Sequence, residues 1–128
     1  MRVIFIILFL VSFGSVSMGG VGDVYYCSME NNVKYKDHKL LKVRLENFKF
    51  KWEENKIVFG SGDNFFRGTE MNIIDSWPVI DKFNIRDNIS LARYDNGHFY
   101  YSGVSAYFKE DATTAISVTT ITATCDKF

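Results

Sequence analysis

The sequence contains few of the residues that build common metal sites, and it carries no excess charge of either sign. Its 128 residues include one proline, two cysteines and two histidines, and the formal net charge at pH 7 is zero. The histidines, His38 and His98, have no second histidine or cysteine nearby at the spacing of zinc ligands. A balanced charge gives no electrostatic bias toward nucleic acid or an anionic membrane. We therefore expect no metal, no cofactor and no nucleic-acid partner.

The sequence also lacks the patterns that are typical of catalysis by a nucleophile. No serine lies in a Gly-x-Ser-x-Gly elbow, and Gly60-Ser61-Gly62 reads as a turn. Glu53 and Glu54 are adjacent, so in a strand their carboxylates would face opposite sides and form a poor acid/base pair. We predict that the protein is not an enzyme.

The first 17 residues have the layout of a secretory signal peptide. Arg2 provides a positive start, and residues 3–11 are an unbroken apolar run. This run is shorter than the roughly 20 residues that span a bilayer, which favours a cleaved signal over the alternative of a membrane anchor. We expect cleavage within residues 17–22, most simply after Ser17. The mature protein would then be secreted or periplasmic, without stable membrane insertion, and would form a single β domain within residues 18–128.

Cys27 and Cys125 bracket nearly all of the chain that follows this segment. In an exported protein this arrangement predicts an end-to-end disulfide, with two free buried thiols as the alternative. A disulfide requires its two Cα atoms to lie within about 7 Å, so the first and last strands must be neighbours. This requirement favours a closed barrel or a tight sandwich over an open sheet, because closure also removes exposed strand edges.

Short alternating segments separated by turn residues predict an all-β protein. We expect one small antiparallel domain of about eight strands, either a lipocalin-like up-and-down β-barrel or a β-sandwich. Asp95-Asn96-Gly97 is the strongest hairpin signal. Residues 79–88 mix apolar and charged side chains, and we expect a loop that contains a helical turn. The expected strands are 24–29, 41–45, 48–52, 57–59, 71–77, 89–94, 98–108 and 114–125.

Two neighbouring segments alternate with opposite parity. Odd positions are apolar in residues 41–45, which predicts a half-buried strand, whereas even positions are aromatic in residues 48–52. A bulge or turn near residues 46–47 must therefore reset the register, because a slip of one residue exchanges the two faces of a strand. Aromatic and basic residues also alternate in single-strand nucleic-acid binders, but here the alternation places the rings in the core and the lysines in solvent.

The sequence offers one candidate interaction surface. Phe65 and Phe66 lie in a glycine-rich turn and Trp77 precedes the only proline, so we expect these three aromatic residues to form an exposed patch. The expected function is binding, without catalysis, of a small apolar ligand or an envelope protein at a concave or end surface. The alternative is a structural or interaction protein that uses an exposed face, such as the hydroxyl-rich last strand, to contact a partner protein.

Four parts of the sequence resemble a group of small exported proteins of marine bacteria and their phages. The resemblance implies bacterial-type export and a pairing of Cys27 with Cys125. It implies no activity, because none is assigned to that group. The residues that carry it are Val24-Tyr25-Tyr26-Cys27, Phe48-Lys49-Phe50 with Lys56-Ile57-Val58-Phe59-Gly60, Gly97-His98-Phe99-Tyr100-Tyr101-Ser102 and Ala123-Thr124-Cys125-Asp126-Lys127-Phe128.

Overall fold

A computed structural model describes residues 20–62, 64–108 and 114–127. The expected signal peptide lies outside these ranges. Within them the chain forms nine β-strand segments and one turn of 3-10 helix. The elements are β1 (Val24–Lys36), β2 (Lys39–Lys42), β3 (Asn47–Trp52), β4 (Lys56–Phe59), β5 (Glu70–Trp77), η1 (Pro78–Ile80), β6 (Lys82–Arg86), β7 (Ser90–Asp95), β8 (His98–Phe108) and β9 (Thr114–Lys127).

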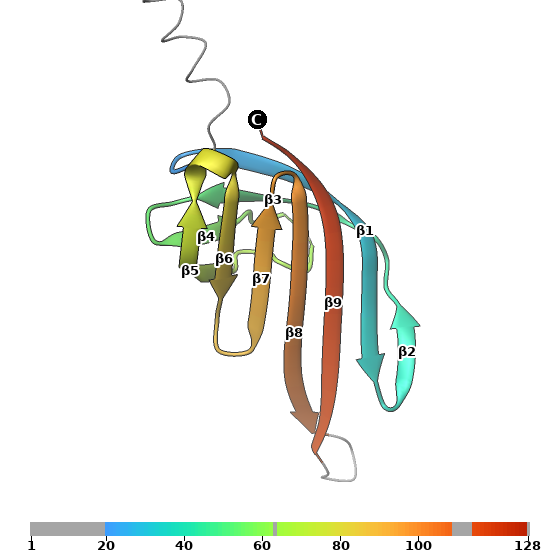
Figure 1. The fold of residues 1–128 in the computed structure, drawn as a ribbon. Coiled ribbons are helices and arrows are strands. Elements are labelled where there is room, and N and C mark those ends of the chain that lie inside the picture. Colours follow the sequence, from blue (N-terminus) through green and yellow to red (C-terminus); the bar gives the residue numbers. More distant parts are fainter. Residues whose placement is uncertain (1–19, 63, 109–113, 128) are drawn as a thin grey trace, which may run out of the picture.

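The strands form a closed antiparallel barrel. Each of the strands from β3 to β8 pairs with the next one along the chain, and β1 pairs with both β3 and β9. The ring therefore contains eight strands in up-and-down order, with β2 attached to β1 outside it (Figure 1). The predicted all-β barrel is confirmed, and the sandwich alternative is wrong.

The first and last strands close the barrel along one long seam. Their register runs from Tyr25 opposite Lys127 to Tyr35 opposite Val118. Cys27 and Cys125 lie directly opposite each other in this seam, with their Cα atoms 4.0 Å apart, and they form a disulfide. The predicted disulfide is confirmed, and it covalently joins the two strands whose pairing closes the sheet.

The chain that pairs with β1 on the side away from β9 is interrupted between β2 and β3. Both β2 and β3 pair with β1, and residues 43–46 separate them. The predicted register reset is therefore confirmed. The prediction of a half-buried strand over residues 41–45 is wrong, because Leu41, Val43 and Leu45 are all exposed. β2 lies beyond the end of the ring, where there is no barrel interior to receive these side chains (Figure 1).

Aromatic side chains fill the barrel interior. The alternation in β3 points Phe48, Phe50 and Trp52 inward and leaves Lys49 and Lys51 in solvent, as predicted. The Phe50 ring illustrates the packing, since its centroid lies 4.8 Å from that of Tyr25 and 5.5 Å from that of Phe83. The largest fully buried side chains are Trp52, Tyr25, Tyr94, Phe50, Phe59, Phe66, Phe83, Phe99, Ile57, Met71, Ile85 and Ile121.

The segment expected to be a loop contributes a strand to the barrel. Residues 82–86 form β6, and its inward-facing residues Phe83 and Ile85 are fully buried. Only the expected helical turn is confirmed, as η1. The charged residues at both ends of this five-residue strand made its short alternating pattern hard to recognise. Pairing with β5 and β7 stabilises the strand.

Candidate functional site

The filled interior determines where a ligand can bind. Inward-facing side chains from the first, middle and last strands of the barrel belong to one continuous hydrophobic cluster. Small barrels are often packed solid in this way, whereas lipocalin-type carriers keep an internal chamber. The described side chains therefore direct the search for a binding site to the outer surface and the barrel ends.

Phe65, Phe66 and Trp77 do not form the expected patch. Phe66 is only 1% exposed and stacks on Phe59 with ring centroids 4.6 Å apart, so its predicted exposure is wrong. Phe65 is 45% exposed and packs edge-on against Tyr101. Trp77 is exposed beside η1, at the opposite end of the barrel, where the Lys82 ammonium lies 5.1 Å from its ring centroid.

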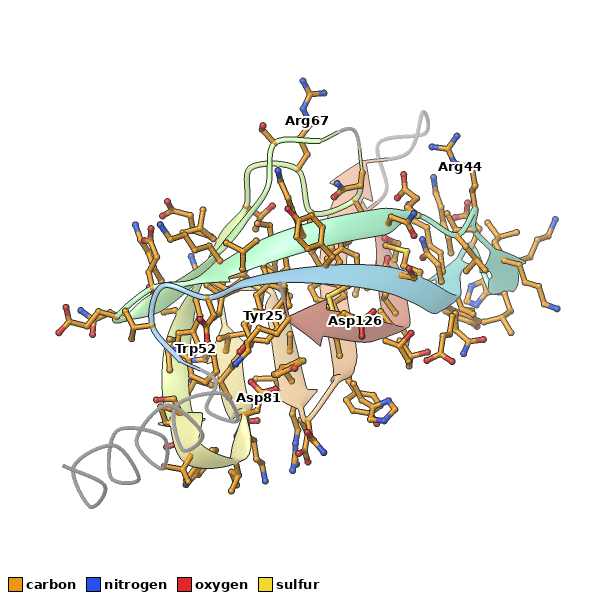
Figure 2. The ribbon with its side chains drawn as sticks, turned by 90° about the horizontal axis from the view of Figure 1, so that it is seen from above. Tyr25, Arg44, Trp52, Arg67, Asp81 and Asp126 are labelled. Atoms are coloured by element: carbon orange, nitrogen blue, oxygen red, sulfur yellow. A yellow bond between two sulfur atoms is a disulfide. The ribbon has the colours of Figure 1, made fainter. Side chains whose placement is uncertain are left out.

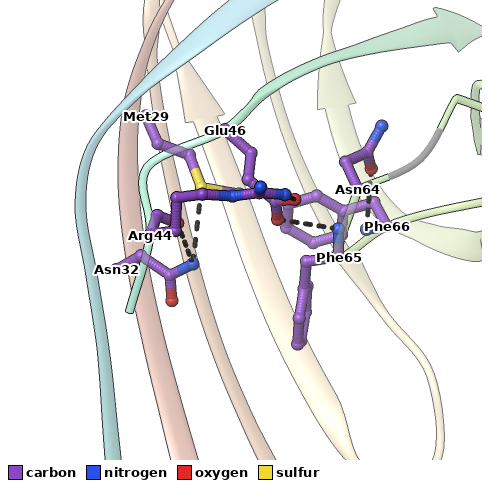
Figure 3. A network of polar contacts seen from close by, with 7 residues as sticks. All are labelled: Met29, Asn32, Arg44, Glu46, Asn64, Phe65 and Phe66. Carbon is purple, nitrogen blue, oxygen red and sulfur yellow. Dashed lines mark hydrogen bonds and ion pairs between the residues drawn. The ribbon is translucent and has the colours of Figure 1, made fainter. Parts of the chain in front are cut away.

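The loop that carries Phe65 and Phe66 is tied to the chain between β2 and β3. The Glu46 carboxylate accepts a hydrogen bond from the Phe65 backbone N–H at 3.1 Å and pairs with Arg44 at 3.3 Å (Figure 3). Asn32 donates to the Arg44 carbonyl at 3.2 Å, and its own Oδ1 is buried without a hydrogen-bond partner among the described residues. These contacts hold the loop at this end of the barrel, where the buried Phe66 ring covers the core.

The opposite end of the barrel is closed by one carboxylate. Asp81 accepts a hydrogen bond of 2.7 Å from the hydroxyl of Tyr25 and another of 2.7 Å from that of Tyr94. Tyr25 and Asp81 are labelled in Figure 2. Burial, followed by hydrogen bonding to Asp81, raises the pKa of both tyrosines above the ordinary value. Both hydroxyls therefore remain protonated donors at neutral pH. The cluster has a structural role, because Asp81 joins the strands that carry Tyr25 and Tyr94.

A groove on the outer face of the sheet is the best candidate for a binding site. It crosses β5 to β9 and has a volume of about 480 Å³. Leu91 and Tyr100 are 56% and 47% exposed in it, although both lie on well-paired strands. Pockets for small ligands typically measure about 300–1,000 Å³ and have mostly apolar walls with a few polar groups. The groove combines this size with a largely apolar surface.

Polar groups border the groove, and they include the Arg93 guanidinium, the hydroxyls of Thr120 and Thr122 and the Asp75 carboxylate. The Arg93 guanidinium pairs with Asp95 at 3.4 Å, and both side chains are about half exposed. Thr122 accepts a hydrogen bond from Asn31 at 3.0 Å, and Thr120 lies two residues earlier on the same face of β9. The groove can therefore offer a cation and several hydroxyl groups to a ligand that covers its apolar surface.

The sequence left this groove unrecognised because the segment containing Leu91 is ambiguous. In β7, Ser90, Ala92 and Tyr94 face inward, whereas Leu91 and Arg93 face outward. An apolar residue occurs on each face, so alternation alone did not identify the buried one. The pairing of Arg93 with Tyr100 across β7 and β8 assembles the outer surface, and this pairing belongs to the tertiary structure.

Two further findings concern the described ranges alone. They contain no group of three or more histidine, cysteine or acidic residues arranged to hold a metal ion. They also contain no helix of sufficient length and apolar character to cross a membrane.

No protein-family model, curated protein or solved structure matches this chain. The resemblance to small exported proteins of marine bacteria and their phages therefore stays a prediction. The function must be argued from the geometry of the site itself.

Proposed function

We propose that this protein is an exported binding protein, without catalytic activity, that holds a small apolar ligand with one anionic or polar end in its outer groove. The observation that carries the proposal is the exposure of Leu91 and Tyr100 in a largely apolar groove of about 480 Å³. The filled interior supports an outer site over an internal one. Export is supported by the signal-like start of the sequence and by the Cys27–Cys125 disulfide.

The polar border of the groove suggests how the ligand would be oriented. An apolar chain would lie across Leu91 and the ring of Tyr100, and its charged end would reach Arg93. An ionised donor strengthens a hydrogen bond to a carboxylate, and the Asp95 partner of Arg93 is exposed and easily displaced. Because the groove is shallow, we expect modest affinity that depends on both the chain and the acid group.

Calorimetric titration with decanoate tests this proposal. Leu91→Glu removes apolar contact area and adds a repelling charge, so we expect binding to weaken by about tenfold or more. Val79→Glu is the matched control, because Val79 is exposed in η1 and does not line the groove. Equal decanoate affinity in the two variants, or no decanoate binding by the unmodified protein, would contradict the proposal.

The role of Arg93 can be tested separately with two ligands that share a chain. Arg93→Gln keeps a long polar side chain but removes the charge. We expect it to weaken decanoate binding and to leave decanol binding nearly unchanged, because only decanoate carries a carboxylate. An equal loss for both ligands would assign Arg93 a packing role instead.

A further inference from the structure

The β1–β2 hairpin exposes apolar side chains that the barrel core does not use. Leu40 is 71% exposed, and Tyr35, its partner across the hairpin, is 45% exposed. The hairpin extends past the closed part of the barrel together with the long strands β8 and β9 (Figure 1). Large exposed apolar side chains that gather on one surface of a small protein mark an interaction site.

These side chains continue into a row across four strands. Leu40 pairs with Tyr35, Tyr35 with Val118, and Val118 with Val104. Directly opposed residues in antiparallel strands point to the same face, so all four lie on the outer face of the sheet. Neighbouring strands are about 4.8 Å apart, and the row is therefore roughly 15 Å long. Ile116, two residues before Val118 on the same face, is also exposed and widens this outer row.

Basic residues surround the Leu40 end of the outer row. Within residues 33–44 the only acidic residue is Asp37. Lys42 lies opposite Val33 on the outer face, whereas Lys39, which precedes Leu40 in the edge strand β2 and pairs with Lys36, lies on the other face of the hairpin. The Arg44 side chain points away from the ribbon and is mostly exposed, although it pairs with Glu46 (Figure 2). The basic side chains of this segment are Lys34, Lys36, Lys39, Lys42 and Arg44.

The zero net charge of the chain conceals this local concentration. At the opposite end of the barrel, Lys127 lies 3.8 Å from Asp23 and Lys82 lies opposite Asp95 across β6 and β7, so the two signs offset each other there. The expectation that charge gives no bias toward an anionic surface holds for the whole chain. It does not hold for the hairpin, because exposed charges act over about one Debye length of roughly 8–10 Å.

We propose that this hairpin docks the protein on an anionic lipid bilayer. The outer row, with Leu40 at its tip, rests in the boundary between headgroups and acyl chains, and the lysines of β2 contact lipid phosphates. Peripheral membrane proteins use the same combination of buried apolar area and attraction to anionic lipids. Long lysine side chains can keep their ammonium groups at the headgroups while their stems cover apolar surface. A soluble polyanion would use the lysines and leave Leu40 without a role.

Co-sedimentation with lipid vesicles tests the docking. We expect the mature protein to bind vesicles that contain phosphatidylglycerol, to bind pure phosphatidylcholine vesicles about tenfold or more weakly, and to dissociate as salt is raised. Lys39→Glu/Lys42→Glu should weaken binding to the anionic vesicles by about tenfold or more. Lys49→Glu/Lys51→Glu is the control, because it makes the same charge change on exposed positions of β3. Equal loss in the two double variants would overturn the proposal.

The apolar part of the surface has its own matched pair of variants. Leu40 is 71% exposed and Val79, at the opposite end of the barrel, is 72% exposed. Leu40→Ser should weaken vesicle binding by about tenfold, whereas Val79→Ser should leave it unchanged. Vesicle binding that Leu40→Ser does not alter, or that is matched by binding to soluble heparin, would identify a polyanion site instead. A dimer in sedimentation velocity that Leu40→Ser dissociates would identify a second copy of the chain as the occupant.

The docking and the ligand proposal can fail independently. Leu91→Glu should weaken decanoate binding and leave vesicle binding unchanged, and Leu40→Ser should do the reverse. Circular dichroism and thermal unfolding of each variant should match those of the unmodified protein, because both side chains are exposed. Loss of both activities in a correctly folded Leu40→Ser variant would contradict the assignment of two separate surfaces.

Discussion

The hydroxyl of Tyr25 donates a hydrogen bond of 2.7 Å to Oδ1 of Asp81, which joins the first barrel strand to the turn between β5 and β6. Tyr94 of β7 donates to the other oxygen of the same carboxylate. Asp81 has a φ of 55°, in the left-handed region that aspartate tolerates better than most residues. One side chain thus links three separate parts of the barrel at the end opposite the β1–β2 hairpin.

Asp81→Asn is expected to destabilise the barrel by about 1–3 kcal/mol, because an amide NH₂ cannot accept the second tyrosine hydrogen and leaves one buried hydroxyl unpaired. Urea denaturation measures this change. Asp95→Asn is the control, since Asp95 forms a half-exposed pair with Arg93, and such pairs contribute about 0–1 kcal/mol. Equal effects of the two substitutions would contradict the structural role of Asp81.

The same cluster predicts loss of stability in alkaline solution. Burial and the bond to Asp81 raise the pKa of Tyr25 and Tyr94 in the folded protein. Below pH of about 10 both states keep these protons, whereas above it the unfolded chain loses protons that the folded protein retains. The free energy of unfolding should therefore fall as the pH rises past this value. Tyr25→Phe removes one such group, so its stability should fall less steeply with pH than that of the unmodified protein. An identical pH dependence for both proteins would exclude Tyr25 from the effect.

Adjacent phenylalanines should respond very differently to the same change. Phe66→Ser removes a buried ring that packs against Phe48, Phe59 and Phe99, and we expect a loss of about 3–5 kcal/mol. Phe65→Ser removes a partly exposed ring and should cost distinctly less. Thermal or urea denaturation of the pair checks this expectation. Similar losses in both variants would show that the loop packs differently.

Reduction of the disulfide should strongly destabilise the barrel. The bond between Cys27 and Cys125 spans a sequence separation of 98, and loss of such a cross-link costs up to about 4–5 kcal/mol in the chain-entropy account. Urea midpoints with and without a reductant measure the effect. The Cys27→Ala/Cys125→Ala variant should behave like the reduced protein and should not respond to the reductant. A response of that variant to the reductant would point to a cause other than the disulfide.

Two parts of the fold could be predicted from local pattern alone. The hairpin at Asn96-Gly97 could be predicted because its turn requires positive φ values, here 45° and 93°, which asparagine and glycine tolerate. The inward direction of the β3 rings could be predicted because aromatic and lysine residues alternate throughout residues 48–52. The strand over Lys82–Arg86 was missed, because it has only two buried apolar residues and gains its stability from its two neighbouring strands.

The candidate sites were harder to predict than the fold. Phe66 is apolar and lies in a turn, so the sequence could not distinguish an exposed ring from a plug of the barrel end. Leu41, Val43 and Leu45 read as the apolar face of a half-buried strand, yet all three are exposed. In each case local sequence describes the side chain, whereas burial depends on which other segments cover it.

The sequence by itself determined the all-β class, the tight turn at Asn96-Gly97 and the pairing of the two cysteines, because φ/ψ preference, alternation and disulfide chemistry act through neighbours or through a unique partner. Only the tertiary structure decided that the sheet closes, that its interior is filled, and that the outer groove and the basic hairpin remain exposed. Closure of the barrel creates an inside and an outside. That distinction, which no short segment contains, assigns Phe66 to the core and Leu40 to the surface.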